Sequence, residues 1–216
     1  MSGIAGYSVS QLKKRVDRFN KKYVDQWDAW IKTARKSRPA QLKLTLGTWQ
    51  ACRPNRLRSA KYIEKLLHQA RSHVRALRSF DIAQRASFTA KACNAILALW
   101  PVFEKLSYAA RKHPSGRTPP RGVRAGVVGI SKAAMLLTDG RLGPAFDSEV
   151  RKHLGIRTIK NADEWLCAIE KASRDVECFV KRRKVTLQKA SGRALHSVRI
   201  HDMALGPAPT IVESQR

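Results

Sequence analysis

The sequence predicts a compact, all-α fold, and three observations indicate it. Apolar side chains recur at three- and four-residue steps along most of the 216 residues, which is the spacing of one face of a helix. No alternation of apolar and polar residues exceeds four residues, and no segment is repeated, so neither a sheet nor a repeat array is expected. With 43% hydrophobic residues, the chain can bury a core as one domain or as two packed lobes.

Four helices are predicted in the first half of the chain. The first covers residues 8–37 and is ended by Arg38 and Pro39, and the second covers residues 42–51. The third follows Asn55, which caps it, and the fourth covers residues 87–112. Pro101 predicts a kink or break in the fourth, because proline has no backbone donor. The apolar faces comprise Leu12, Val16, Phe19, Tyr23, Trp27 and Trp30 in the first helix, Leu57, Ile63, Leu66, Leu67, Val74 and Leu77 in the third, and Ile96, Leu97, Trp100 and Phe103 in the fourth.

The second half begins with a loop. Residues 113–122, HPSGRTPPRG, hold three prolines and two glycines and cannot continue a helix. Further on, Asn161 predicts the start of a helix that ends near Lys184, and a last helix covers residues 192–205. We therefore expect an N-terminal helical lobe (1–112), a linker or loop (113–124), a second lobe (125–205) and a flexible tail (206–216).

The charge of the chain indicates an anionic partner. Lys and Arg number 43 against 16 Asp and Glu, which gives a net charge of +27. Three long segments contain no Asp or Glu at all. Residues 105–138 contain seven Lys or Arg, residues 178–201 contain seven, and residues 29–63 contain nine. Unneutralised basic stripes of this kind are typical of proteins that bind nucleic acid, with an affinity that falls steeply with salt.

Cysteines and histidines indicate neither a metal site nor a disulfide framework. The four cysteines form no C-x-x-C pair, and the six histidines show no metal-ligand spacing. We expect reduced, mostly packed thiols. The chain also has no apolar run of membrane-spanning length and no signal pattern at its start, so a cytoplasmic, nucleoid-associated protein is expected, without membrane contact.

The segment GVVGISKAAMLLTDGRLGPAFDSEV, residues 126–150, combines features that chemistry could use. A tight turn at Gly129 before a helix would let backbone N–H groups approach a phosphate. The backbone of Val127, Gly129 and Ser131, helped by Lys132, would form this clamp, although a plain turn between helices explains the same stretch. Asp147 stands where a helix begins and is an ordinary cap by itself.

Taken in order, V-V-G-I-S-K-A, G-P-A-F-D-S-E-V-R and L-G resemble a signature of base-excision DNA glycosylases. This is the helix-hairpin-helix and Gly/Pro-Asp (HhH-GPD) superfamily, whose hairpin L-P-G-V-G-x-K-x-A precedes V-D-T-H-V-x-R-x-x-x-R-L-G. The likeness covers residues 126–155. Val127 departs from the first hairpin glycine, the loop before Asp147 is shorter, and Ser131 stands where bifunctional members carry a Schiff-base lysine. Lys132 lies about 100° further round the helix, and the iron-sulfur cysteine loop of some members is missing.

The resemblance implies a divergent small member of this superfamily, with a cleft between two helical lobes. It implies a monofunctional DNA glycosylase, acting as a monomer on double-stranded DNA, that flips a base and hydrolyses its N-glycosidic bond. Asp147 would stabilise the sugar cation and orient or deprotonate the attacking water. The hairpin would grip phosphates of the same strand, with a monovalent cation as the only bound ion and no other cofactor.

A base pocket needs aromatic walls and polar groups that read the edge of the base. The candidate walls are Trp49, Trp100, Phe103 and Tyr108, although aromatic residues at helical spacing are typical of a core. Gln50 or Arg53 would read or replace a base. Asp202, in a basic stretch, is predicted to form an ion pair or network and not a second catalytic carboxylate.

Three functions stay open on the sequence. They are the glycosylase, a non-catalytic DNA-binding protein that uses a helix-hairpin-helix phosphate clamp, and an RNA-associated basic protein, for which RRM or KH stacking motifs are missing. The large positive charge further suggests densely modified DNA as a substrate, such as phage genomes with glucosylated cytosine, and hence a bacterial defence role. Oxidised or alkylated purines and mismatched bases remain alternatives.

Overall fold

The computed structural model describes residues 3–52, 56–107 and 124–206. Within these ranges every regular element is a helix, apart from a single bridge between Leu57 and Ser107. The predicted all-α class is therefore confirmed. The predicted linker, except its last residue, and the tail after Gly206 lie outside the described residues.

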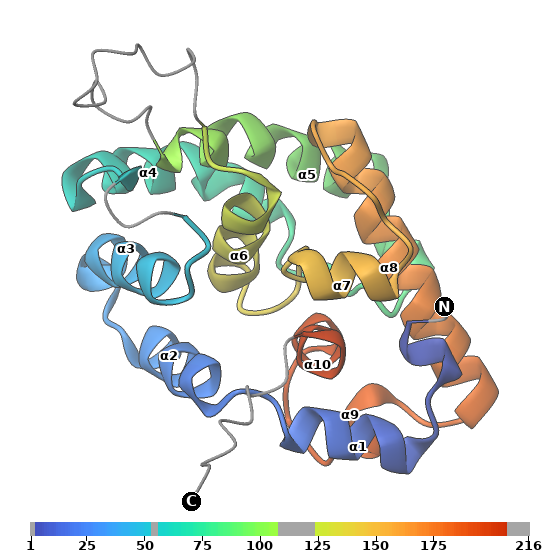
Figure 1. The fold of residues 1–216 in the computed structure, drawn as a ribbon. Coiled ribbons are helices and arrows are strands. Elements are labelled where there is room, and N and C mark those ends of the chain that lie inside the picture. Colours follow the sequence, from blue (N-terminus) through green and yellow to red (C-terminus); the bar gives the residue numbers. More distant parts are fainter. Residues whose placement is uncertain (1–2, 53–55, 108–123, 207–216) are drawn as a thin grey trace, which may run out of the picture.

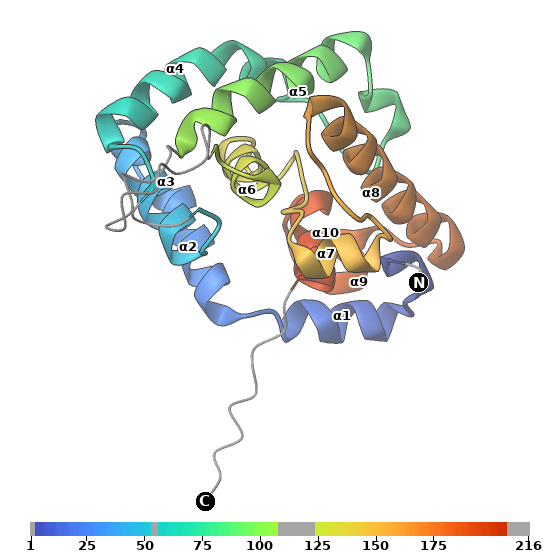
Figure 2. The ribbon, with the colours of Figure 1, turned by 45° about the horizontal axis from the view of Figure 1, so that its top comes forward.

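The helices form a ring around a central group (Figure 1). The outer elements are η1 (Ile4–Gly6), α1 (Val9–Asp17), α2 (Lys21–Lys32), α3 (Arg38–Thr48), α4 (Ala60–Ala76), α5 (Ala90–Phe103), α8 (Ala162–Arg183) and α9 (Leu187–Ser191). The central elements are α6 (Val127–Leu137), α7 (Ser148–His153) and α10 (Ser197–Leu205). Figure 2, in which the top of the molecule comes forward, shows the same ring around α6, α7 and α10.

Two of the three central helices, α6 and α10, are almost wholly buried. Every residue of α10 is buried, and so are eight consecutive residues of α6, from Gly129 to Leu136. A helix that is buried on all sides needs partners on all sides, and the outer ring supplies them. A polar side chain on α6 or α10 is therefore held within the protein and has few conformations open to it.

The predicted first helix is in fact two helices. α1 ends at Asp17 and α2 begins at Lys21, because the Asn20 side chain caps α2 by accepting from the Lys22 N–H at 3.0 Å. Pro39 ends no helix; it lies in the first turn of α3, where its missing donor costs nothing. Trp27 and Trp30 are buried as predicted.

Three other predicted boundaries also move. α4 is capped by Ser59, whose hydroxyl accepts from the Tyr62 N–H, whereas Asn55 lies outside the described residues. α5 runs through Pro101 as far as Phe103, so the helix does not break at this proline, whereas the alternative of a kink stays a prediction. The last predicted helix, 192–205, begins only at Ser197 as α10, because Gly192 ends the separate short helix α9 in the left-handed region at φ 69°.

The longest helix follows its prediction closely. The Asn161 side chain accepts from the Glu164 N–H at 2.8 Å and begins α8, which ends at Arg183. Trp165, Ile169 and Val176 of the predicted apolar side are fully buried. Local signals, a cap and a periodic stripe, therefore suffice for this element.

Both ends of the described chain pack together. α1 lies against α9 and α10, and the Asp175 carboxylate of α8 accepts from the backbone N–H groups of Ile4 and Ala5 at 2.8 and 2.9 Å. Residues 3–17 thus pack with helices of the predicted second lobe. The division into lobes at residue 112 stays a prediction.

Candidate active site

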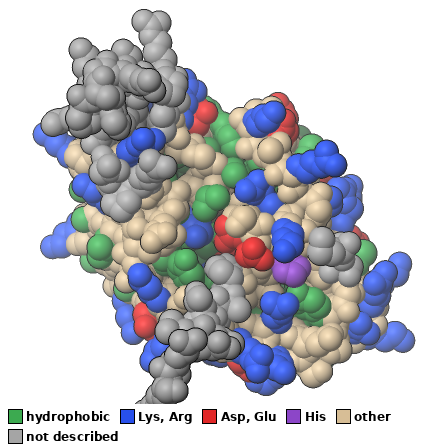
Figure 3. Space-filling model, viewed as in Figure 1, with side chains coloured by type: hydrophobic (Ala, Val, Ile, Leu, Met, Phe, Trp, Pro, Cys, Tyr) green, Lys and Arg blue, Asp and Glu red, His purple; other side chains and the backbone are tan. Residues whose placement is uncertain are grey.

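A cleft gathers three of the predicted site residues. Trp49 at the end of α3, Lys132 of α6 and Asp147 before α7 all line it. Phe19, Tyr23, Met135, Ala145, Arg199, Asp202 and Gly206 complete its walls. Figure 3 shows acidic side chains near the middle of this face of the molecule, with Lys and Arg side chains around them. The cleft therefore combines aromatic walls with buried charges of both signs.

Asp147 is held at the cleft by its own helix. Its carboxylate accepts from the Val150 N–H at 3.0 Å, as the cap of α7, and it borders the cleft at the same time. Its predicted place at the start of a helix is confirmed. A cap fixes the carboxylate but uses only some of its acceptor sites, so the remaining sites are free for a ligand.

The loop before Asp147 is tied down from two sides. The Ser131 hydroxyl of α6 accepts from the Phe146 N–H at 3.1 Å, and the Asp202 carboxylate of α10 accepts from the Ala145 N–H at 3.0 Å. Gly143, at φ 139°, provides a backbone conformation that other residues rarely adopt. Two central helices thereby set the position of Asp147.

Arg199 and Asp202 form a buried ion pair, as the sequence predicts for Asp202. The Arg199 Nη1 to Asp202 Oδ2 distance is 2.7 Å, and both side chains are almost fully buried. The guanidinium carbon lies 5.0 Å from the ring centre of Phe19 and 4.9 Å from that of Trp27. This packing holds the pair at one wall of the cleft.

Lys132 points into the cleft. Its ammonium lies 5.1 Å from the Tyr23 ring centre and 5.5 Å from that of Trp49, and the residue is 7% exposed. Burial lowers the Lys132 pKa, although Asp202 and Asp147 oppose that shift. Lys132, which stands one position beyond the Schiff-base lysine of the HhH-GPD signature, thus lines the cleft, whereas Ser131 faces the loop.

The cleft is narrow. Its cavity volume is about 10 Å³. That space admits about one water molecule. A base could enter only after the cleft side chains move apart.

We expect Asp147 to make folding stability depend on pH. Burial raises its pKa above the ordinary value of 3.8, and the charge of Asp202 adds to this, against the Val150 N–H and Lys132. The folded state therefore holds this proton more tightly than the unfolded state, so ionised Asp147 lowers stability at neutral pH. The free energy of unfolding of Asp147→Asn should exceed that of the wild type at pH 7. The gain should shrink as pH falls through the raised pKa towards 3.8.

Urea titrations at several pH values measure this difference. Asparagine also caps helices well, so loss of the cap does not mask the effect. An Asp147→Asn gain that stays constant down to pH 3 would contradict the linkage.

The predicted glycine turn is wrong. Gly126 is the cap of α6, and Val127 and Gly129 already lie in its first turn. The Ser131 hydroxyl donates to the Val127 carbonyl at 2.7 Å, and its buried side chain faces no solvent. The N–H groups of a first turn have no acceptor within the helix, so phosphate binding by this backbone stays a prediction, now at a helix start.

Gly129 has a packing role instead. A Cβ atom there would lie 2.5 Å from the Cys52 Sγ and 3.2 Å from the Ala51 carbonyl oxygen. Gly129→Ala should therefore lower the free energy of unfolding by about 1–3 kcal/mol, although alanine normally favours a helix by about 1 kcal/mol. Thermal unfolding checks this. In protein that already carries Cys52→Ala, the sulfur is gone, so adding Gly129→Ala should raise the free energy of unfolding. If the losses of the two single variants simply added in the double variant, the contact would be contradicted.

The other predicted pocket residues have mixed outcomes. Trp100 and Phe103 are core residues outside the cleft, and Trp100 packs on Trp165 at 5.8 Å between ring centres. Gln50 is exposed and does not line the cleft. Arg53 and Tyr108 lie outside the described residues.

The cysteines are free, but only partly packed as predicted. Cys52 is buried, and burial raises its thiol pKa to about 11. Cys167 and Cys178 are exposed on α8. In residues 3–52, 56–107 and 124–206, no three His, Cys, Asp or Glu side chains are grouped to hold a metal ion.

Several cleft residues were not predicted as site residues. Phe19 and Tyr23 belong to a helical stripe that reads as core, and Arg199 reads as one of many basic residues. The only local signal was the three-residue spacing of Arg199 and Asp202, which suits a pair on one helix.

No helix of the described chain has the length and apolar character needed to cross a membrane.

Comparison with known proteins identifies no relative. No protein-family model, no curated protein and no solved structure matches the chain.

Proposed function

We propose that the protein is a monofunctional DNA glycosylase that removes a damaged or modified base. The observation that carries this proposal is the convergence of Asp147, Lys132 and Trp49 on one aromatic-walled cleft. The resemblance of residues 126–155 to the HhH-GPD signature names the same aspartate independently of the cleft. The net charge of +27 supports DNA as the partner.

The chemistry asks for one carboxylate beside the sugar. As the C1′–N bond breaks, its electrons leave with the base and the sugar gains oxocarbenium character, which ionised Asp147 stabilises. A water molecule then bonds to C1′ and gives a proton to Asp147, which passes it to solvent or the base. The products are an abasic site and a free base.

Base recognition would use the aromatic walls and an unused donor. The Trp49 indole N–H is buried and has no acceptor in the described part of the chain, which is unusual for a buried donor. Tyr23 and Trp49 lie 5.8 Å apart at an angle of 74°. If the two rings moved apart as the cleft opened, a base could stack between them, with the Trp49 indole N–H as a donor at the edge of the site.

A panel of modified DNAs tests the proposal. It includes alkylated, oxidised, deaminated and mismatched duplexes and phage DNA with glucosylated cytosine, each treated with alkali to reveal abasic sites. We expect strand breaks with the wild type on at least one substrate and none with Asp147→Asn. Blank lanes throughout, with duplex binding retained, would favour the non-catalytic DNA-binding protein, which the narrow cleft also suits.

The position of Lys132 favours one further candidate, a glycosylase with lyase activity. A buried amine with a lowered pKa is a better nucleophile. It would add to C1′ of the abasic aldehyde, lose water to form an iminium ion, and permit elimination of the 3′ phosphate. Borohydride would trap this ion as a covalent protein–DNA adduct. An adduct with the wild type but not with Lys132→Gln would support the lyase, and no adduct would leave the monofunctional enzyme.

A further inference from the structure

A groove lies next to the cleft, and two residues line both of them. These are Phe19 and Gly206. The groove offers about 310 Å³, which reaches the lower end of the size of ligand sites, whereas the cleft holds about one water molecule. The remaining lining residues are Tyr7, Gln11, Lys14, Arg15, Arg18 and Met203.

The rim of this groove is basic and lacks acidic partners. Lys14, Arg15 and Arg18 are exposed on or just after α1, and none makes an ion pair with any residue of the described ranges. The nearby acid, Asp17, is engaged by Lys13 at 2.7 Å and by Arg193 at 2.9 Å. Three cations along one edge of a groove suit a chain of phosphates.

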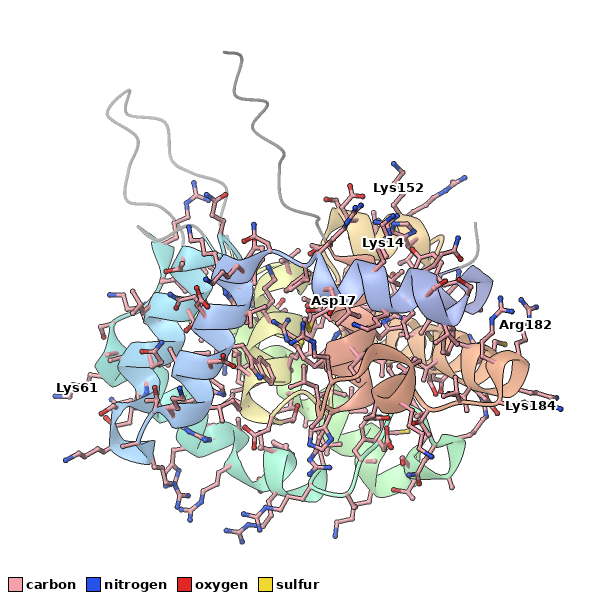
Figure 4. The ribbon with its side chains drawn as sticks, turned by 90° about the horizontal axis from the view of Figure 1, so that it is seen from below. Lys14, Asp17, Lys61, Lys152, Arg182 and Lys184 are labelled. Atoms are coloured by element: carbon pink, nitrogen blue, oxygen red, sulfur yellow. The ribbon has the colours of Figure 1, made fainter. Side chains whose placement is uncertain are left out.

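The charge of this rim continues on α7. Burial lowers the pKa of His153 at the end of α7, and the charge of Arg15 on α1 lowers it further. The end of α7 therefore lies close to α1. Figure 4 shows Lys14 and Lys152 extending on the same side of the molecule, whereas Lys61 and Lys184 stand at its two ends. Basic side chains of α1 and α7 therefore extend on the same side of the molecule.

The floor of the groove is suited to a base. Met203 and Phe19 are buried apolar residues there, and the Arg15 guanidinium lies 5.8 Å from the Tyr7 ring centre. The Tyr7 hydroxyl is buried and has no partner in the described chain. An aromatic surface beside a basic edge is the usual composition of sites for unpaired nucleotides.

We propose that this α1 groove binds an unpaired stretch of the DNA strand that enters the cleft. Phosphates would lie along Lys14, Arg15 and Arg18, and one unstacked base would rest on Tyr7 and Met203. The inference rests on DNA being the partner, as in the proposed function, but needs no base excision.

Neutralising the basic edge tests the groove. Lys14→Gln/Arg18→Gln is compared with Lys61→Gln/Lys184→Gln, which removes the same charge at exposed sites that do not line the groove. Fluorescence anisotropy measures binding of an oligothymidylate over a range of salt concentrations. We expect the groove variant to lose affinity about tenfold or more at low salt and its salt slope to fall by about 1.4, at 0.7 for each contact. The control variant should keep the wild-type slope.

Photo-crosslinking locates the strand. An oligonucleotide carrying 5-bromodeoxyuridine should crosslink to the peptide containing Tyr7, and Lys14→Gln/Arg18→Gln should lower the yield by the same factor as the affinity. Equal slopes for the two double variants would overturn the proposal. So would preferential binding of the wild type to phosphatidylserine vesicles through the same residues, which would assign the groove to membranes.

The outcomes for groove and enzyme are separable. Asp147→Asn protein should bind the oligonucleotide like the wild type, because Asp147 does not line the groove. Absence of abasic sites with a normal groove response would contradict only the glycosylase. Normal excision by Lys14→Gln/Arg18→Gln, with unchanged binding, would contradict only the groove.

Discussion

Asp147→Asn is expected to lower base excision by about two to four orders of magnitude, while duplex binding stays as tight as in the wild type. Asparagine keeps the cap on the Val150 N–H but cannot offer a negative charge to the sugar or accept the proton of water. Single-turnover assays on the best substrate of the panel measure the excision rate, and anisotropy measures binding.

Asp17→Asn is the matched control for this variant. Asp17 is also a carboxylate, but it lies on the surface and pairs with Lys13 and Arg193. Its replacement should change excision less than about threefold, in line with the small energies of exposed ion pairs. If Asp147→Asn kept the wild-type rate, Asp147 would be a helix cap and nothing more.

Arg199→Ala is expected to produce the largest loss of stability, about 3–5 kcal/mol in the free energy of unfolding. The change leaves the buried Asp202 carboxylate without its ion partner, 2.7 Å away in the wild type, and removes the packing of the guanidinium on Phe19 and Trp27. Urea unfolding at pH 7 gives the value. Since Asp202 also holds the Ala145 N–H, excision should fall as the loop before Asp147 loosens.

The exposed pair of Arg124 and Glu104 provides the comparison. Its N to O distance is also 2.7 Å, but the Arg124 side chain is 65% exposed, so Arg124→Ala should cost less than about 1 kcal/mol. Similar losses for Arg199→Ala and Arg124→Ala would show that burial adds nothing to the Arg199–Asp202 pair.

Features that depend on neighbouring residues were predictable. Asn161 and Asp147 cap α8 and α7 because a short polar side chain satisfies an N–H three residues ahead. The stripe of Trp165, Ile169 and Val176 predicts the buried face of α8. Boundaries failed where a competing cap was overlooked, as at Asn20 and Gly192.

By itself, the sequence determined the helical class, the strong positive charge and the start of a helix at Asp147, since all three depend on composition or on contacts within one turn. Only the tertiary structure decided which aromatic residues meet Asp147, that Lys132 and not Ser131 enters the cleft, and that Gly129 accommodates Cys52. These outcomes depend on how α6 and α10 are packed inside the ring. The spacing along one helix does not determine which distant side chains that helix will contact.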